Sequence, residues 1–535
     1  MFFSTDRKSA TLQILLVVLT IMIYGRGLGF ALLNYDDNFN ITGNLHLLSG
    51  DWVYFWSHSY VDLFIPVTYS LWLFIYKLFG MSAPAFHTAV ILFHIANVLL
   101  LFQILKRLIQ SDEAAFWGAL LFMVHPLNVE TVFWATALKD TLVYFFVLGA
   151  VLIYFANPKL KFLVIVFMIL GILSKPTAGV LPFLFFLLAF SETGGESVFD
   201  RLKKSAKKNI WLVLPMLAGL AALLSAKITL SNEVAAIGDI SLTEKFITVG
   251  DSVGFYLQKV VFPAGLYPDY GRTPRLVLDQ KLYFLNIAIA VFFISAVLFA
   301  LRKMGRNKKE AAAAPITFAL LFGLLFYLPV SGIVHFGYQR ISSTADRYMY
   351  PVLMALGILI GWAGKQALES RFKNRFRLGA VIIFIFFGFL NFMYSQNWKD
   401  DLHFFTNMHE GNSRNFYAAH NLAQIYQHQG RSAEALELFI QAHELDPLKM
   451  SSVAGIVTVY FNAKRYSDMD SFGLTQLQPE QLKKMNFNAE AAMAIYRSYA
   501  LAYLDRKKEA QALTFWQAAR VMTPTILGSV QGSIA

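Results

Sequence analysis

The chain has 535 residues, of which 56% are hydrophobic and only 15% are charged, and it contains 50 Phe. Soluble domains carry about a quarter charged residues, so this composition is typical of a membrane protein. The formal net charge is +12, but Lys and Arg lie mostly in short clusters between apolar runs, as in cytoplasmic loops, and we expect no nucleic-acid partner. The absence of cysteine excludes disulfides and thiolate metal sites.

A bilayer core requires about 20 apolar residues per helix. The apolar runs predict an all-α, polytopic bundle of about eleven spans, at 11–31, 85–106, 114–127, 137–156, 160–174, 177–190, 210–228, 283–301, 314–330, 349–364 and 377–394. The first run is longer than the apolar region of a cleavable signal peptide and no small-residue cleavage site follows it, so we do not expect it to be one. Two amphipathic segments, 66–80 and 243–263, carry charges and predict interfacial helices on the outer surface.

The basic loops orient the chain, because Lys and Arg are enriched on the cytoplasmic side. The N-terminus is therefore predicted to be cytoplasmic, whereas Asp36, Asp37 and everything after the last span face out. A bacterial inner membrane is favoured over the endoplasmic reticulum, because cysteine is absent and Asn40-Ile41-Thr42 would be a glycosylation acceptor inside the same outer loop. The C-terminal part would then be periplasmic, or lumenal in the alternative.

A helical-repeat domain is predicted at 396–535, after a membrane domain at 1–395. Segment 414–447 matches the 34-residue tetratricopeptide pattern, with small residues where two helices approach and Pro447 at the end. A second copy at 491–524 has the same register and ends at Pro524, and a degenerate copy is predicted near 448–480. Such a stack is a docking surface without chemistry of its own.

Polar side chains gather at the outer ends of several predicted spans, where charges are costly and usually paired or functional. They occur in the stretches NYDDNFNIT, HPLNVETVFWATALKDTLVYFF, LSKPTAGVLP and HFGYQRISSTADRYMYP. The candidate site residues are Asp36, Asp37, His125, Glu130, Lys139, Asp140, Lys175, His335, Arg340, Arg347 and Tyr348.

The order of these motifs, followed by the repeats, resembles the transmembrane and tetratricopeptide-repeat O-mannosyltransferases and their bacterial relatives. It is more distantly similar to protein O-mannosyltransferases and lipid A aminoarabinose transferases, all of the GT-C superfamily that uses polyprenyl-phosphate sugars. The resemblance implies a catalytic carboxylate in the acidic pair Asp36-Asp37, a second acidic residue at Asp140 and a basic residue at Lys175. This chain has Leu138 where eukaryotic members usually have the Arg of an RKD triplet.

The chemistry that the resemblance implies is transfer of one sugar from a polyprenyl-phosphate donor to an acceptor hydroxyl, with inversion. The leaving phosphate needs cationic ligands, for which the candidates are Lys139, Lys175, Arg340 and Arg347. The hydroxyl needs a base, for which we favour Asp36, with Asp37 orienting the acceptor or the sugar. Further candidates are the carboxylates Asp140 and Glu130, and His125, His335 and Tyr348 for substrate binding.

No cofactor is expected to be required; Mg²⁺ or Mn²⁺ held by Asp36, Asp37 and Asp140 is the alternative. The expected acceptor is Ser or Thr of a protein docked on the repeats, with a glycolipid or polysaccharide as the alternative. The rival from another class is a non-catalytic scaffold that assembles an envelope complex.

Simpler interpretations of single residues also exist. Glu130 and Lys139 could form a structural ion pair, and Arg347 could pair with Asp346. Lys175 could extend its amine toward the interface, and His125 is better explained as a structural hydrogen-bond donor.

Overall fold

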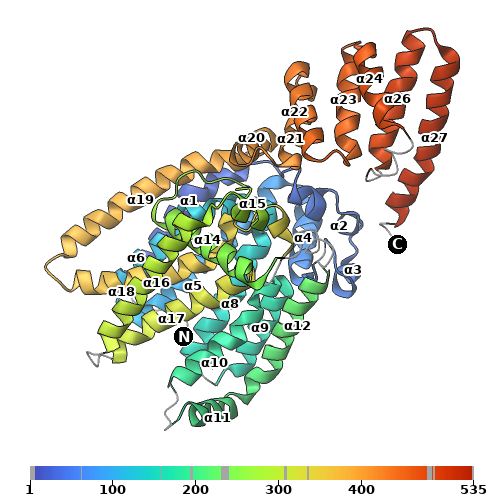
Figure 1. The fold of residues 1–535 in the computed structure, drawn as a ribbon. Coiled ribbons are helices and arrows are strands. Elements are labelled where there is room, and N and C mark those ends of the chain that lie inside the picture. The colour runs from blue at the N-terminus through green and yellow to red at the C-terminus, as the bar shows by residue number, and fades with distance from the viewer. Residues whose placement is uncertain are drawn as a thin grey trace. The chain divides into compact units, whose positions relative to one another are not determined.

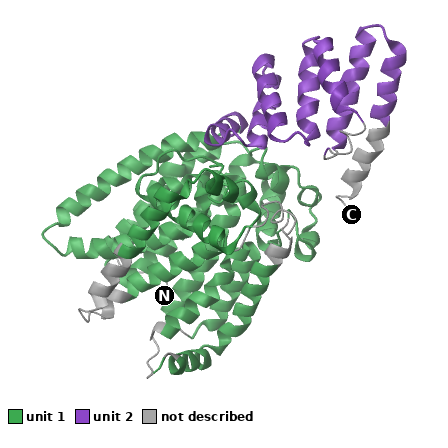
Figure 2. Cartoon of the chain, in the orientation of Figure 1, with its two compact units in different colours: residues 1–400 green, residues 401–535 purple. Residues whose placement is uncertain are grey.

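The structure, a computed structural model, describes residues 7–61, 63–157, 159–192, 197–229, 240–305, 310–333, 336–478, 485 and 488–532. Within these ranges every regular element is a helix, so the predicted all-α class is confirmed; an isolated bridge joins Tyr60 and Leu63. The chain divides into two compact units, 1–400 and 401–535 (Figures 1 and 2). The boundary predicted at 395/396 lies in the same stretch.

The first unit is a bundle of apolar helices joined by short 3-10 segments (Figure 1). Its longer helices are α1 (Arg7–Tyr24), α5 (Ala83–Ile109), α6 (Asp112–Val124), α8 (Leu138–Ala156), α9 (Lys161–Ser174), α10 (Leu181–Glu192), α12 (Val213–Thr229), α16 (Tyr283–Gly305), α17 (Glu310–Tyr327), α18 (Tyr350–Leu368) and α19 (Lys373–Ser395).

Fewer helices than the expected eleven are long and apolar enough to cross a membrane. Among the described residues there are five, at Arg7–Gly29, Ala83–Ile109, Ala135–Ala156, Asp346–Leu368 and Lys373–Trp398. Counting two bent pairs as single spans gives up to seven: Asp112–Val124 with Pro126–Phe133, bent by 54°, and Phe199–Lys208 with Ile210–Leu224, bent by 73°.

Four of the remaining predicted spans are shorter apolar helices, at Lys161–Ser174, Pro176–Phe190, Tyr283–Ser295 and Ala314–Val330. At a rise of about 1.5 Å per residue, Lys161–Ser174 and Pro176–Phe190 fall short of a core roughly 30 Å thick. The other two ranges are parts of longer helices, α16 (Tyr283–Gly305) and α17 (Glu310–Tyr327). The structure therefore supports a multi-pass membrane unit of five to seven candidate spans.

Glycine allows close helix contact in this bundle. A Cβ on Gly118 of α6 would lie 2.3 Å from the carbonyl oxygen of Gly357 on α18. The two helices can therefore approach this closely only because glycine occupies both contact positions, as is common where membrane helices associate.

Helices also form at the two segments that were predicted to be interfacial. Helix α4 (Pro66–Phe79) buries Tyr69 and Trp72 and exposes Phe74 and Phe79. Helix α14 (Leu242–Val261) begins with a capping box, in which Ser241 and Glu244 satisfy each other's backbone amides. Their location at a membrane interface stays a prediction.

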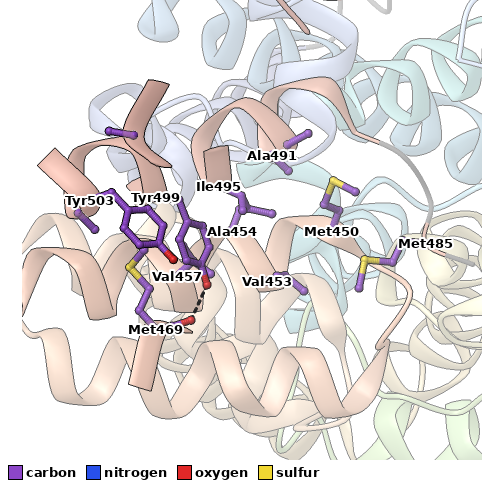
Figure 3. Packing of buried hydrophobic residues seen from close by; sticks show 13 residues of the cluster. Met450, Val453, Ala454, Val457, Met469, Met485, Ala491, Ile495, Tyr499 and Tyr503 are labelled. Carbon is purple, nitrogen blue, oxygen red and sulfur yellow. Dashed lines mark hydrogen bonds between the residues drawn. The ribbon is translucent and has the colours of Figure 1, made fainter. Parts of the chain in front are cut away.

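The second unit consists of α20 (Asp401–Gly411) followed by three helix pairs: α21 (Phe416–His428) with α22 (Ser432–Leu445), α23 (Met450–Asn462) with α24 (Tyr466–Gln476), and α26 (Ala489–Asp505) with α27 (Glu509–Gly532). Figure 3 shows the apolar contact between the last two pairs, where the Tyr499 hydroxyl donates to the Met469 carbonyl at 2.6 Å. The segment that we expected to be degenerate thus forms a complete pair.

The three pairs share one turn geometry. Gly430, Lys464 and Lys507 have φ values of +77°, +55° and +57° in the turns between paired helices. A glycine adopts this left-handed conformation freely, whereas a lysine adopts it at some cost. The prediction that Pro524 ends the last repeat is wrong, because α27 continues to Gly532.

Candidate active site

The acidic pair lies in one helical turn between the 3-10 helix η1 (Gly25–Gly29) and the π-helix η2 (Asn38–Thr42). Asp37 is fully buried. Its Oδ2 accepts from the Leu33 amide at 2.9 Å, and its Oδ1 accepts from the Thr136 amide at 2.8 Å and also from the Thr136 hydroxyl. Burial raises the pKa of Asp37 to about 6, although these hydrogen bonds act against the shift. Asp37 therefore attaches this loop to the segment before α8.

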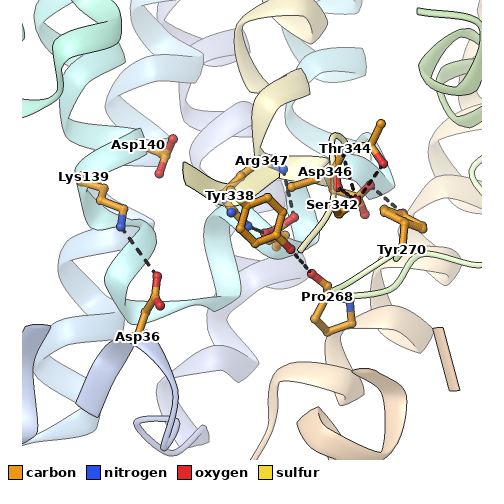
Figure 4. A network of polar contacts seen from close by, with 12 residues as sticks. Asp36, Lys139, Asp140, Pro268, Tyr270, Tyr338, Ser342, Thr344, Asp346 and Arg347 are labelled. Atoms are coloured by element: carbon orange, nitrogen blue, oxygen red, sulfur yellow. Dashed lines mark hydrogen bonds and ion pairs between the residues drawn. The ribbon is translucent and has the colours of Figure 1, made fainter. Parts of the chain in front are cut away.

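Asp36 has a different environment from its neighbour. Its side chain is 37% exposed, and its Oδ2 lies 3.9 Å from Lys139 Nζ (Figure 4). Its backbone carbonyl accepts from the Asn40 side chain at 2.8 Å, and Asn40 in turn accepts from the Tyr69 hydroxyl at 2.7 Å. Of the two carboxylates, Asp36 is accessible to a substrate, and Asp37 holds the loop that carries Asp36 in place.

The second acidic position lies in the first turn of α8. Asp140 is buried and its Oδ1 is paired with Lys175 Nζ, whereas its Oδ2 is buried without a hydrogen-bond partner. Lys175 follows the last residue of α9 in extended conformation, before the 3-10 helix η5 (Pro176–Val180). Lys139 and Asp140 are adjacent in the chain. The pairs Asp36–Lys139 and Asp140–Lys175 therefore each use one of two consecutive residues of α8.

A third ion pair joins the short helix α7 (Val129–Phe133) to the 3-10 helix η9 (Asp346–Met349). Glu130 is buried; it is paired with the Arg347 guanidinium and accepts from the Arg347 amide at 3.0 Å. This pairing differs from both structural alternatives considered above, Glu130 with Lys139 and Arg347 with Asp346.

Aromatic rings surround Arg347. Its guanidinium carbon lies 4.3 Å from the ring centre of Tyr338, 5.0 Å from that of Tyr348 and 5.5 Å from that of Trp134. Lys139 Nζ lies 6.0 Å from the same Trp134 ring, so this indole lies beside both cations. Asp346 accepts instead from the Tyr270 hydroxyl at 2.7 Å (Figure 4).

The remaining candidates are His125, Arg340 and His335. His125 is buried; its Nδ1 accepts from the Leu127 amide at 3.3 Å and its Nε2 lies 3.0 Å from the Val260 carbonyl, which favours a structural role. Arg340 ends the 3-10 helix η8 (Gly337–Arg340) and is exposed. His335 lies outside the described residues.

The carboxylates are not arranged as a metal site. Throughout the described ranges, no group of three or more His, Asp or Glu side chains is placed to hold a metal ion. Asp37 and Asp140, two of the three ligands considered for Mg²⁺ or Mn²⁺, are bonded to Thr136 and Lys175 instead. That the chemistry requires no metal stays a prediction.

The residues that sequence reasoning missed are partners of those it found. Thr136, Trp134 and Tyr270 contact Asp37, Arg347 and Asp346, respectively. Thr136 and Trp134 lie inside the second motif, between Glu130 and Lys139, but nothing in their residue types distinguishes them from core residues. Tyr270 lies in a loop that carried no motif.

The first unit has three carboxylate–cation pairs at the ends of apolar helices, and the second unit consists of helix pairs. Together they define a multi-pass membrane protein with a charged candidate site and a repeat domain. The tetratricopeptide repeat family matches residues 416–449. The chain is 23% identical over 398 residues to Protein O-mannosyl-transferase F38B6.6 of Caenorhabditis elegans, which covers 73% of this chain and 55% of that protein. It thus spans about half the length of this curated relative. The predicted resemblance to O-mannosyltransferases is confirmed as a distant relationship.

Two solved structures of ArnT from Cupriavidus metallidurans are also similar to the chain. The one bound to undecaprenyl phosphate has a TM-score of 0.40 and 16% identity, and covers 87% of this chain and 81% of that chain. The apo structure has a TM-score of 0.40 and 14% identity, and covers 90% of each chain.

Proposed function

We propose that the chain is a membrane glycosyltransferase that moves one sugar from a polyprenyl-phosphate donor to an acceptor hydroxyl. The observation that carries the proposal is the half-exposed Asp36 beside Lys139, next to the buried pair of Asp140 and Lys175. This arrangement provides an accessible base and two cations on adjoining helix ends. The distant relationship to a protein O-mannosyltransferase supports the reaction class.

The proposed reaction is a single displacement. Asp36 accepts the proton of the acceptor hydroxyl as the acceptor oxygen bonds to the anomeric carbon. The bond between that carbon and the phosphate oxygen breaks, and its electron pair stays on the phosphate. Lys139 and Lys175 stabilise the released polyprenyl phosphate, because ammonium groups bind phosphate oxygens strongly where water is scarce. Attack opposite the leaving group inverts the anomeric centre.

Asp140 is the second functional carboxylate in this proposal. Its Oδ1 orients Lys175, and its buried Oδ2 has no hydrogen-bond partner among the described residues, so a sugar hydroxyl is a suitable donor for it. Glu130 fixes Arg347 among the aromatic rings rather than acting on the reacting atoms. Asp37 is a positioning residue, since all its described hydrogen bonds are to Leu33 and Thr136.

We further propose that the acceptor is Ser or Thr of a protein that binds the tetratricopeptide unit. The support is the name of the curated relative and the general use of such repeats as peptide-docking surfaces. The distribution of Lys and Arg supports a cytoplasmic N-terminus, with the site and the repeats on the opposite side and, in bacteria, in the periplasm.

The test is a reconstituted transfer assay that measures release of free polyprenyl phosphate from mixed polyprenyl-phosphate sugars, with a crude envelope fraction as acceptor. Asp36→Asn should lower the rate by a factor of roughly 100 or more, which is what loss of a general base removes. The matched control is Asp279→Asn, at an exposed position near the end of α15 (Pro274–Asp279). Equal release by the wild type and Asp36→Asn would refute the assignment of the base. Absence of release from every preparation, with envelope proteins still bound through 401–535, would favour the scaffold function.

A further inference from the structure

A cavity of about 670 Å³ lies between α14, α16 and the loop that follows α14. Much of its lining is apolar and faces outward: Val261, Phe262, Leu285 and Phe292 are 80%, 68%, 66% and 77% exposed. Single exposed apolar residues are normal, but a contiguous set around a cavity marks a site for an apolar ligand. On a membrane protein, the ligand nearest to such a mouth is a lipid chain.

The inner part of the same cavity is polar. Arg272 Nη2 lies 2.6 Å from Asp251 Oδ1, and the Asn286 side chain donates to the same oxygen at 2.6 Å. Gln258 donates to Asn286 at 2.5 Å. The helices are held close here, because a Cβ on Gly254 of α14 would lie 1.9 Å from the Asn286 carbonyl oxygen. The polar part is therefore a fixed network and not a set of mobile surface side chains.

Two cations line the cavity, and neither has all its donors used. Arg272 Nε is buried without a partner. Lys259 Nζ donates to the carbonyls of Ala264 and Gly265 at 2.5 and 2.9 Å, so the third N–H of the ammonium is available to a ligand. Burial lowers the pKa of Lys259, so an anion bound beside it would be stabilised by a poorly hydrated charge. Two carboxylates act on these cations: Asp251 is paired with Arg272, and the charge of Asp346 opposes the lowering of the pKa of Lys259.

We propose that this cavity binds a membrane amphiphile with an anionic, phosphate-type head group, in addition to the donor phosphate position at Lys139 and Lys175. The head group contacts Lys259 and Arg272, and the hydrocarbon chain follows the exposed apolar side of α16. The proposal does not require transfer chemistry. The source of this head group is either a polyprenyl phosphate or an anionic phospholipid, which share this chemistry.

The site is connected to the candidate active site by hydrogen bonding and packing. Lys259 Nζ lies 5.4 Å from the centre of the Tyr270 ring, and the Tyr270 hydroxyl donates to Asp346 at 2.7 Å. Asp346 precedes Arg347, the partner of Glu130. Occupancy of the cavity is therefore expected to be sensed at Arg347 through Tyr270.

The test is retention of lipid by the full chain in detergent, measured by native mass spectrometry after titration with polyprenyl phosphate, phosphatidylglycerol or phosphatidylcholine. Lys259→Gln removes one cation, and Ile289→Trp fills the cavity from α16. Each should weaken binding of the anionic lipid at least roughly tenfold, as expected for loss of about 1.4 kcal/mol. The matched controls are Lys245→Gln on the same helix, which does not line the cavity, and Leu217→Trp at an exposed position of α12.

Displacement of phosphatidylglycerol by polyprenyl phosphate would assign the site to the carrier, and retention of phosphatidylglycerol alone would assign it to a phospholipid; either result supports the proposal. Equal retention of phosphatidylcholine, or equal binding by all four variants with unchanged thermal midpoints, would overturn it. Because binding is measured without turnover, this outcome is independent of the transfer assay.

Discussion

The hydroxyl of Thr136 should stabilise the loop that carries Asp36, and this contribution should depend on pH. In Thr136→Val the side chain keeps its shape but cannot donate to Asp37, which keeps the two amide donors, Leu33 and Thr136. A hydrogen bond to a charged group contributes about 1.5–3 kcal/mol, so the variant should lose stability of that order at pH 8.

The sign of the pH dependence follows from the pKa of Asp37. The bond favours the ionised carboxylate, so its loss raises the pKa of Asp37 further above about 6. A loss of about 1.5–3 kcal/mol corresponds to a rise of about one to two pKa units, so at pH 8 Asp37 is ionised in the wild type and most of the difference in stability is present. As the pH falls through the two folded pKa values, both proteins bind the proton and the difference shrinks.

The assay is the thermal unfolding midpoint of the purified protein at pH 8 and pH 5, followed by tryptophan fluorescence. Thr136→Ser, which keeps the hydroxyl, is the control and should stay close to the wild type. A deficit of the same size at both pH values would refute the argument, as would a Ser variant as unstable as the Val variant.

Three further predictions concern stability and local dynamics. Glu130→Gln leaves the buried guanidinium of Arg347 without a counter-charge and should cost about 3–5 kcal/mol, seen as a lower thermal midpoint; a midpoint near that of the wild type would contradict the described pair. Gly118→Ala places its Cβ 2.3 Å from a backbone oxygen of α18 and should cost about 1–3 kcal/mol, whereas Gly379→Ala, with no atom within 4 Å, should be tolerated in the same thermal assay. Lys464→Gly relieves a left-handed lysine, at φ +55°, and should stabilise its helix pair by about 1 kcal/mol, measured as slower hydrogen exchange in 450–476; faster exchange there would contradict it.

Sequence motifs located the charged residues that form the three ion pairs, but not which residue pairs with which. Asp36 and Asp37 are adjacent and chemically identical, yet one is half-exposed and the other fully buried. That difference depends on Thr136, which is distant in the chain and ordinary in type. Likewise, the pairing of Glu130 with Arg347 depends on how two short helices meet.

Periodicity predicted the existence of the helices and repeats better than the residues at which they begin and end. The 34-residue pattern located the first and last helix pairs and left the middle pair as a degenerate copy, although the turn at Lys464 has the same left-handed geometry as the turn at Lys507 in the last pair. The break at Lys175 was predicted from the sequence, whereas the bend between Asp112–Val124 and Pro126–Phe133 was not.

The carboxylates and cations of the candidate site pair with one another, and this pairing constrains which substitutions the protein can accept during evolution. Each carboxylate in the three pairs has one cation, and each pair joins two segments that are separated in the chain. Loss of one member of either buried pair leaves the other charge buried and unpaired, so a single substitution is selected against even where the partner itself is dispensable. We therefore expect Asp140 with Lys175, and Glu130 with Arg347, to be inherited or replaced together among homologues. The looser pair of Asp36 and Lys139 should covary less, because reactivity and not neutralisation would preserve Asp36.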